Sequence, residues 1–399
     1  MYGVYVITGL LMVLSTVEIR RRYRHLHYLS RIPIRVHVNG TRGKSSVTRL
    51  IAAGMRAGGI QTIAKTTGTK PRFIYDDGTE VPVVRIGKAN IIEQLRIVRR
   101  AAELEAQAIV IECMAVMPEL QSLAEDQMIR STHSVITNAR ADHLDEMGPT
   151  VTDVARNLAR TISHEGRFFT SEHEHLEILK AMAAERNSSV TITDATTVAE
   201  SELAGFTYFE HPENVSLALA VCASFGVERE VALSGMQKAT PDSGALRIYD
   251  LDNFGRHIRF INALAMNDPD SYCIVWERLK PWIPNNARSV VLLNCRKDRI
   301  QRAEQLGDLI VNKLTADLCL LTGDGTVPVY DRARRKGLAR ERLLDMGGAD
   351  AADVFERVLA AAEHQPVVVF AIGNIVGLGE EIVNHFFSRG TEIVYRSSS

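Results

Sequence analysis

The sequence predicts an α/β protein in which a P-loop and a doubly wound, mostly parallel sheet are followed by a smaller Rossmann-like α/β domain. Short apolar runs typical of buried strands alternate with amphipathic helical patterns along most of the chain. A glycine-rich turn directly follows the first of these strands and opens a helical pattern. At 399 residues, the chain is also longer than a single hydrophobic core usually supports.

The chain begins with an apolar segment that we expect to form a helix within residues 1–30. No charged side chain precedes Glu18, and four arginines lie among positions 20 to 24. The 17 uncharged residues would make a helix of roughly 26 Å, the short limit for crossing a bilayer. The segment lacks the basic start and the cleavage site of a removable signal peptide. It favours a membrane anchor, or a helix that docks on a membrane protein, over a buried or interfacial helix of a soluble protein.

Residues 31–245 are expected to form the first α/β domain. Its first strand, Ile32–Val38, alternates in polarity, and the helix that follows ends at Gly58-Gly59. A second helix with a clear amphipathic pattern lies in "NIIEQLRIVRRAAELEA". The other expected strands of this domain are "IQTIA", "AIVIEC", "HSVITN", "RFFTS" and "VTIT".

A second α/β run follows a break in this pattern. The break, "TPDSGALR", suits a hinge, so the domain boundary is placed at residue 246 and the C-terminal domain covers residues 246–399. The strands expected in this second domain are "HIRFINALA", "SVVLLNC", "ADLCLLTGD" and "PVVVFAIGN".

Composition argues against several classes of protein. The net charge of −1 and the charged fraction of 24% are ordinary for a globular protein, so no nucleic-acid partner is expected. The five cysteines are scattered and form no C-x-x-C pair. This pattern favours buried thiols in a reducing compartment over a disulfide framework or a zinc site.

The stretch "VHVNGTRGKSSVTRL" indicates a phosphate-binding loop. A strand leads into a glycine-rich turn and a helix N-terminus, where backbone amides and the helix dipole attract anions. Lys44 can reach the outer phosphates, and the Ser45 hydroxyl can ligate Mg²⁺. The strict P-loop pattern has a glycine where this chain has Val38, and the alternative is a helix cap in which Ser45 or Ser46 satisfies an amide. The residues expected to bind nucleotide here are Asn39, Gly40, Thr41, Arg42, Gly43, Lys44, Ser45 and Ser46.

Two further segments place polar residues after apolar strands. "VIECMAV" has Glu112 at the end of one strand, and "VITNARADHLDEMG" has Asn138, Asp142 and His143 after another. Ligands of open α/β sheets bind outside the carboxyl ends of the strands, where the P-loop also lies. Carboxylate and imidazole groups there suit Mg²⁺ held between phosphates and a substrate. The alternatives are a strand-end charge that faces solvent and a helix cap with a surface histidine.

Together these motifs resemble those of the Mur ligase and folylpolyglutamate synthase superfamily. The similar segments are "N-G-T-R-G-K-S", "V-I-E-C" and "T-N-x-x-x-D-H-L-D". The resemblance implies a Mur ligase-like central domain with ATP and Mg²⁺ as cofactors. It also implies catalytic roles for Lys44, Glu112, His143 and Arg247, the last of which takes the place of the family's linker arginine in "SGALR".

More distant segments extend the resemblance. "HPENVSLALAVCASFGV" is similar to the family segment that would place Asn214 near the nucleotide base. "FINALAMNDPDS" is similar to the segment that opens the last domain and touches the ribose, which implies that Asn262, Asn267 and the linker residue Arg247 help to bind the nucleotide.

The implied metal ligands are Ser45, Glu112, His143 and Thr69. Thr69 belongs to "TTGT", which resembles the family's T-x-G-T segment, and the alternative is a plain threonine-rich turn. The family's carbamoylated lysine has no counterpart, because no lysine occurs between Lys88 and Lys180. A second Mg²⁺ would therefore have to be held differently.

Within the superfamily, the chain is most similar to the ligase subunit of poly-γ-glutamate synthases of the CapB/PgsB type. Arg42, the apolar start followed by arginines, and the lack of room for a UDP-sugar-binding domain before the P-loop carry this resemblance. It implies an ATP-dependent amide ligase that activates a γ-carboxyl group as an acyl phosphate and joins glutamate units into a capsule or secreted polymer, releasing ADP and phosphate. Glutamate and poly-γ-glutamate are the implied substrates.

The same resemblance implies small membrane subunits as partners, self-association, and a position at the cytoplasmic face of the cell membrane. Two other hypotheses remain at this point. One is a soluble folylpolyglutamate synthase-like or other amino-acid ligase, and the other is an ATP-gated protein for polymer assembly or export.

Overall fold

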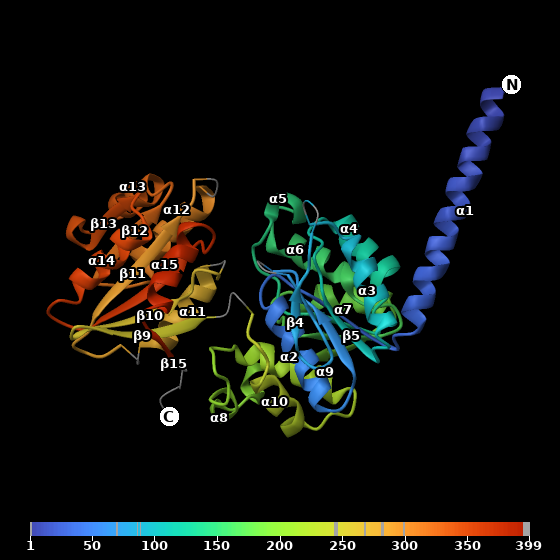
Figure 1. Ribbon diagram of the computed structural model, residues 1–399, viewed down its shortest axis with the longest axis horizontal. Helices are drawn as coiled ribbons and strands as arrows, with labels where there is room; N and C mark the ends of the chain where they lie inside the picture. The colour runs from blue at the N-terminus through green and yellow to red at the C-terminus, as the bar shows by residue number, and fades with distance from the viewer. Residues whose placement is uncertain are drawn as a thin grey trace. The chain divides into compact units, whose positions relative to one another are not determined.

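The computed structural model describes residues 2–68, 71–85, 87, 89–242, 246–266, 269–280, 283–297 and 300–393. The chain divides into two compact units, the first formed by Met1–Gly205 with Glu210–Asp242 and the second by Phe206–Phe209 with Ser243–Ser399. Each unit has one sheet with helices packed around it (Figure 1). The predicted α/β class with two mostly parallel sheets is confirmed.

The sheet of the first unit has eight strands in the order β4-β3-β2-β5-β1-β6-β7-β8. The run from β2 to β8 is parallel, and β3 and β4 are antiparallel additions at one edge. The strands are β1 (Ile34–Asn39), β2 (Thr62–Lys65), β3 (Arg72–Ile74), β4 (Glu80–Pro82), β5 (Ala108–Glu112), β6 (His133–Ile136), β7 (Arg167–Thr170) and β8 (Ser189–Ile192).

Helices cover this sheet on both faces. α2 packs against α9 and α10, whereas α3 packs against α1 and the π-helix η1. The helices are α1 (Tyr2–Ser30), α2 (Lys44–Ala57), α3 (Glu93–Glu103), α4 (Pro118–Leu123), η1 (Ala124–Ile129), α5 (Leu144–Met147), α6 (Val151–Leu158), α7 (Leu176–Glu185), α8 (Glu200–Leu203), α9 (Pro212–Ala223) and α10 (Arg229–Gln237). Two short 3₁₀ turns, η2 and η3, lie at Ala159–Thr161 and Ala195–Thr197.

The central strand β5 shows how the sequence pattern positions the site. All five of its residues are buried. Successive side chains point to opposite faces, so Ile109 and Ile111 enter the core that also contains Ile97 of α3. Glu112 points to the other face and reaches Ser45 on α2. The apolar run of β5 therefore places the Glu112 carboxylate at the carboxyl edge of the sheet, beside α2.

The sheet of the second unit has seven strands in the order β13-β12-β11-β14-β10-β9-β15. The five strands from β13 to β10 are parallel, and β9 is antiparallel to both of its neighbours. The strands are β9 (Arg247–Asn253), β10 (Arg256–Asn262), β11 (Arg288–Cys295), β12 (Leu318–Gly323), β13 (Leu343–Gly347), β14 (Val367–Gly373) and β15 (Thr391–Ile393). The helices are α11 (Pro269–Leu279), α12 (Ile300–Asn312), α13 (Val327–Arg335), the 3₁₀ turn η5 (Arg340–Arg342), α14 (Ala351–Ala361) and α15 (Leu378–Phe387).

Each face of this second sheet has a buried apolar core. Trp276 and Phe370 lie in one core, and Phe260 and Phe386 are stacked in the other. Four of the five cysteines are buried, and Cys273 is partly buried.

The predicted N-terminal helix is present as α1. Leu29 packs into the core beneath α3, whereas the apolar residues from Val4 to Ile19 are exposed. Among the described residues, no helix has both the length and the apolar character needed to cross a membrane.

Candidate active site

The P-loop connects the end of β1 to the start of α2. Gly43 directly precedes α2 and has a positive φ of 82°. Gly40 also has a positive φ, and a Cβ atom there would lie 2.0 Å from the Thr137 hydroxyl oxygen. Both conformations favour glycine, and at Gly40 the close approach of the neighbouring loop excludes a side chain. The predicted strand, turn and helix N-terminus are therefore present.

The side chain of Asn39 holds the start of this loop through three hydrogen bonds. Its Nδ2 donates to the side-chain oxygens of Gln121 and Thr161 at 2.9 and 3.1 Å, and its Oδ1 accepts from the Gly40 amide at 2.8 Å. Asn39 is buried, so these bonds are shielded from water. The residue predicted to bind nucleotide thus holds the start of the loop in place.

Lys44 folds back onto the loop itself. Its Nζ donates to the carbonyl oxygens of Gly40 and Thr41 at 2.6 and 3.2 Å. Burial lowers the pKa of Lys44, although the nearby Glu112 carboxylate opposes this effect. Reaching a γ-phosphate requires the ammonium to exchange these carbonyls for phosphate oxygens. Ser46 lies half-buried in the same first turn of α2.

Ser45 and Glu112 form the best candidate for a magnesium site. The Ser45 hydroxyl donates to Glu112 Oε2 at 2.9 Å, and the Thr67 amide donates to the same oxygen at 2.6 Å. Glu112 is only 2% exposed. A hydroxyl and a carboxylate are oxygen ligands of the kind that Mg²⁺ prefers, so the residues present fit this ion. Thr69, the third expected oxygen ligand, lies outside the described residues.

The loop after β6 is tied to the P-loop by short hydrogen bonds. The Asn138 side-chain oxygen accepts from the Thr41 hydroxyl at 2.7 Å and from the Arg42 amide at 3.1 Å. The Arg42 carbonyl in turn accepts from Asn138 Nδ2 at 3.1 Å and from the Thr137 hydroxyl at 2.5 Å. The backbone of Arg42 is therefore fixed on both sides by residues about 95 positions away in the chain.

Asp142 and His143 follow in the same loop. Two nitrogens of the Arg42 guanidinium contact the two Asp142 oxygens at 2.8 and 3.3 Å. His143 has a left-handed backbone (φ 46°) and is about half exposed, with Glu146 and Asp142 as its nearest acidic neighbours at 3.7 and 4.0 Å.

The structure does not bring His143 to the Ser45–Glu112 pair. Within the described part of the chain, no hydrogen bond or ion pair joins His143 to either residue, and no three His, Cys, Asp or Glu side chains gather into a metal-holding group. The expected role of His143 at a second metal remains a prediction.

Asn214 lies beside the P-loop, as the predicted nucleotide contact requires. A Cβ atom on Gly43 would lie 2.6 Å from Asn214 Oδ1. Asn214 Nδ2 donates to Glu210 Oε1 at 2.8 Å, and the amide of His211 donates to the same oxygen at 2.9 Å.

Glu210 was not singled out by the sequence analysis. Its burial raises its pKa to about 7, because these two hydrogen bonds offset only part of the desolvation and the carboxylates of Asp242 and Glu213 add to it. The only local signal is an acidic residue directly before the "HPEN" start of α9.

The predicted residues of the second unit have partners within that unit. Arg247, the first residue of β9, forms an ion pair with Glu392 of β15 at 3.2 Å. Asn262, the last residue of β10, is buried and accepts from the Leu264 amide at 3.2 Å. Asn267 lies outside the described residues. The nucleotide-binding roles of these residues remain predictions.

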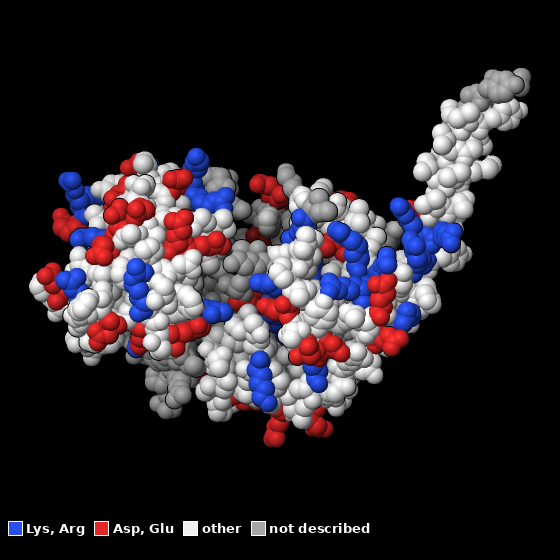
Figure 2. All heavy atoms as spheres, in the orientation of Figure 1, with Lys and Arg blue, Asp and Glu red and all other residues white. Residues whose placement is uncertain are grey.

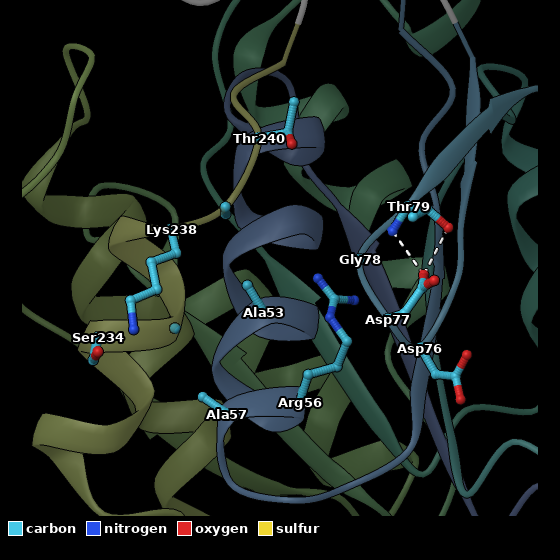
Figure 3. A pocket seen from close by; sticks show the side chains of 12 residues that line it. Ala53, Arg56, Ala57, Asp76, Asp77, Gly78, Thr79, Ser234, Lys238 and Thr240 are labelled. Carbon is cyan, nitrogen blue, oxygen red and sulfur yellow. Dashed lines mark hydrogen bonds between the residues drawn. The ribbon is translucent and has the colours of Figure 1, made fainter.

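A surface pocket of about 570 Å³ lies elsewhere on the first unit. Figure 3 shows Arg56 of α2 and Lys238 after α10 on its walls, and Asp77 accepting from the backbone and hydroxyl of Thr79 at 2.8 and 2.6 Å. The α2 residues that line it come from the C-terminal end of the helix. Ala53, the lining residue of α2 nearest to the P-loop, is about 14 Å along the helix from Lys44, and none of Lys44, Ser45 and Glu112 lines the pocket, so this pocket is separate from the candidate active site.

Two protein families match the chain. Residues 38–240 match the Mur ligase middle domain, and residues 248–389 match the poly-gamma-glutamate synthase CapB C-terminal domain. The first match covers the P-loop, Glu112 and His143, and the second covers all of the second sheet except the first residue of β9 and the last strand.

Two relatives cover most of the chain. The capsule biosynthesis protein CapB of Bacillus anthracis is 37% identical over 362 residues, which are 90% of this chain and 78% of the relative. The PGA synthase CapB of Bacillus subtilis (strain 168) is 34% identical over 373 residues, which are 93% of this chain and 94% of the relative.

Solved structures of lower identity share the fold. Mycobacterium tuberculosis folylpolyglutamate synthase complexed with ADP and AMPPCP has a TM-score of 0.66 at 16% identity, covering 96% of this chain and 99% of that chain. E. coli FolC in complex with ADP has a TM-score of 0.68 at 16% identity, covering 95% and 98%. The two-unit architecture is therefore that of known ADP-binding proteins.

Proposed function

The chain belongs to the CapB family of poly-γ-glutamate synthases, built on the Mur ligase fold, and we propose from this premise that its P-loop unit activates the γ-carboxyl group that is extended. It is an ATP-dependent amide ligase that joins glutamate units into poly-γ-glutamate and releases ADP and phosphate. ATP and Mg²⁺ are its cofactors. The soluble folate-type ligase and the ATP-gated export protein are not favoured.

The observation that carries the proposal is the contact between Ser45 and Glu112. Ser45 is one residue from Lys44 on α2, and Glu112 ends the buried strand β5. Their 2.9 Å hydrogen bond places an oxygen pair suited to a divalent cation directly beside the glycine-rich loop. Nucleotide phosphates and a cation can therefore be held in one place.

The reaction needs a better leaving group than a carboxylate provides. An oxygen of the γ-carboxylate attacks the terminal phosphorus of ATP, the bond to the bridging oxygen breaks, and ADP leaves. The amine of the next glutamate then attacks the acyl carbon, loses a proton, and expels inorganic phosphate. When bound, Mg²⁺ neutralises charge on the phosphate oxygens.

In this proposal the protein contributes position and charge. The amides of the glycine-rich loop and the Lys44 ammonium stabilise the negative charge on the transferring phosphoryl group. Ser45 and Glu112 would hold Mg²⁺, and Asn214 would contact the nucleotide base. Arg247, Asn262 and Asn267 are proposed to complete the nucleotide site. His143 is proposed to lie beside the carboxylate that is activated.

Trapping of the activated carboxyl group tests the function. Hydroxylamine added during turnover should yield a γ-glutamyl hydroxamate only when ATP, Mg²⁺ and glutamate or polymer are all present. ATP hydrolysis that is indifferent to any carboxylate substrate, with no hydroxamate formed, would reject the ligase mechanism. Folate in place of glutamate is the matched control and should support no turnover.

We also propose that α1 attaches the enzyme to the cytoplasmic face of the membrane, through small membrane subunits of the same synthesis complex. Residues Val4 to Ile19 carry the exposed apolar side chains of α1. Figure 2 shows basic side chains gathered where this apolar part ends, and the exposed arginines there are Arg20, Arg21, Arg22 and Arg24. An apolar helix followed by arginines suits a membrane interface. Self-association of the enzyme is part of the same proposal.

Cell fractionation tests this attachment. The full chain should sediment with membranes when its partner subunits are expressed, and a chain that lacks residues 2–19 should not. Full-length protein that stays in the supernatant under these conditions would overturn the proposed location, while leaving the ligase activity untouched.

A further inference from the structure

Arg42 stands out because its guanidinium forms a two-pronged ion pair within the active-site loops. Nη1 and Nη2 contact the two oxygens of Asp142 at 2.8 and 3.3 Å. Both side chains are about one-fifth exposed, so a molecule in solution can reach the pair. The planar guanidinium fork matches the two oxygens of a carboxylate better than it matches a single point charge.

Backbone hydrogen bonds hold the loop at Arg42 when its side chain exchanges partners. The guanidinium also donates from Nη1 to the Thr41 carbonyl at 3.1 Å. The amide and carbonyl of Arg42 are both bonded to Asn138, and the carbonyl also accepts from Thr137. The Cα position is therefore held while the long side chain can turn away from Asp142. A second cation, Lys44, directly follows Gly43 at the end of the same loop.

Arg42 and Lys44 suit different anionic groups. The reaction brings a triphosphate and a substrate carboxylate together at this loop. The loop amides and Lys44 suit the phosphates, because a lysine ammonium acts as a point charge on phosphate oxygens. The guanidinium of Arg42 already binds two carboxylate oxygens, those of Asp142, so it suits the carboxylate of the substrate.

We propose that Arg42 binds the substrate carboxylate that is to be phosphorylated, and that Asp142 occupies this position until the substrate displaces it. Asp142 thus acts as a built-in competitor of the same chemical class as the substrate. The proposal rests on the proposed function and refines it by assigning Arg42 to the carboxylate substrate instead of the nucleotide.

This exchange fits the phosphoryl transfer step. A carboxylate held by one guanidinium fork keeps a lone pair on each oxygen for attack on the terminal phosphorus. No proton moves, because the attacking group is already ionised, and ADP carries away the electron pair of the broken bond. Asp142, once displaced, is a free carboxylate beside His143.

The first test compares Michaelis constants for the two substrates. Arg42→Ala should raise the KM for poly-γ-glutamate about 10- to 100-fold, because hydrogen bonds to a charged group are lost, and should leave the KM for ATP within twofold. Arg42→Lys keeps the charge without the fork and should give an intermediate KM. The matched control is Arg156→Ala, which removes an exposed ion pair with Asp153 on α6 and should change neither constant.

The second test leaves Arg42 in place. Asp142→Asn removes the competing charge and should lower the KM for poly-γ-glutamate several-fold. An unchanged or raised KM in this variant would overturn the proposal, whether or not Arg42→Ala folds.

Two further outcomes distinguish a failure of the proposed function from a failure of the role proposed for Arg42. Wild-type protein without carboxylate-dependent ATP turnover would reject the proposed function itself. A functional wild type in which Arg42→Ala raises the KM for ATP, or weakens calorimetric ADP binding, while sparing the KM for the polymer, would assign Arg42 to the nucleotide and reject only the present inference.

Discussion

The carboxyl edges of the two sheets have the same architecture but differ in the side chains at their central strands. In the first unit, parallel strands end beside charged groups, among them Lys44, Glu112 and the Arg42–Asp142 pair. In the second unit, the strands β10, β11 and β14 end at or beside neutral amides. Ligands of open parallel sheets bind at the carboxyl edge, so the topology of each sheet allows a ligand to bind there.

The second edge is filled by its own side chains and backbone. Asn294 is 3% exposed, donates to the Asn374 carbonyl at 2.6 Å and accepts from the Thr322 hydroxyl at 3.3 Å. Gly373 and Gly323 each lie so close to a neighbouring backbone oxygen that an added Cβ atom would be 2.3 Å from it at Gly373 and 2.4 Å at Gly323. Satisfied amides and close packing stabilise this edge. The charged groups at the first edge bond to one another or to backbone groups of nearby loops, and a ligand can replace these contacts. A shared fold thus does not imply shared chemistry.

The largest expected effect of this difference is at Lys44. Lys44→Ala should reduce hydroxamate formation at least about 1,000-fold, because the charge that stabilises the transferring phosphoryl group is lost. Circular dichroism should show an unchanged fold, since the hydrogen bonds that the Lys44 ammonium donates to Gly40 and Thr41 lie within its own loop. Lys238→Ala, which removes an exposed lysine from the separate pocket, is the control and should keep full activity. Substantial polymer synthesis by Lys44→Ala would contradict the assignment of the first edge.

Glu210 bonds to Asn214 beside the P-loop and should make the unfolding free energy depend on pH. Burial raises its pKa from 4.5 to about 7, so the protonated form is favoured in the folded chain. The stabilisation that the protonated carboxyl gives to the folded chain is fully present below pH 4.5 and is lost as the pH rises through 7. A shift of about 2.5 pKa units corresponds to about 3 kcal/mol at 1.36 kcal/mol per unit.

Glu210→Gln keeps the acceptor for Asn214 and removes the titration. Between pH 4.5 and 8, the wild type should therefore lose about 3 kcal/mol of unfolding free energy relative to this variant. Urea titrations followed by circular dichroism measure this difference. Glu185→Gln, a change at an exposed site on α7, is the control and should retain the wild-type pH dependence. Parallel pH profiles for wild type and Glu210→Gln would show that Glu210 does not titrate in this range.

Local patterns were sufficient for much of the fold and the centre of the site. Alternation of strands and helices predicted both sheets, since each element carries its own periodicity. "GKS" after an apolar strand predicted the P-loop, and the position of Glu112 at the end of "AIVIE" predicted its place beside Ser45. Each of these inferences needs only residues close together in the sequence and the rule that parallel strands end at one edge.

Features that depend on distant pairing could not be predicted in this way. The hairpin β3–β4 was missed because each strand has three residues, too few to show alternation. The Arg42–Asp142 pair joins residues 100 positions apart, and Glu210 is notable only because folding removes it from water. β9 pairs with β15 across more than 130 residues, and nothing in "TEI" alone indicates a strand.

The smallest expected effect concerns Asn294, and it separates packing from ligand binding at the second edge. Asn294→Ala should lower the unfolding free energy of the second unit by about 2 kcal/mol, because buried polar groups lose their partners. Trp276 is buried in a core of that unit, so tryptophan fluorescence during urea unfolding measures its stability. Asn384→Ala, an exposed site on α15, is the control. Calorimetric ADP binding should stay within twofold of wild type, since the charged loop of the first unit is unchanged. Weakened ADP binding without loss of stability would mean that Asn294 contacts the nucleotide.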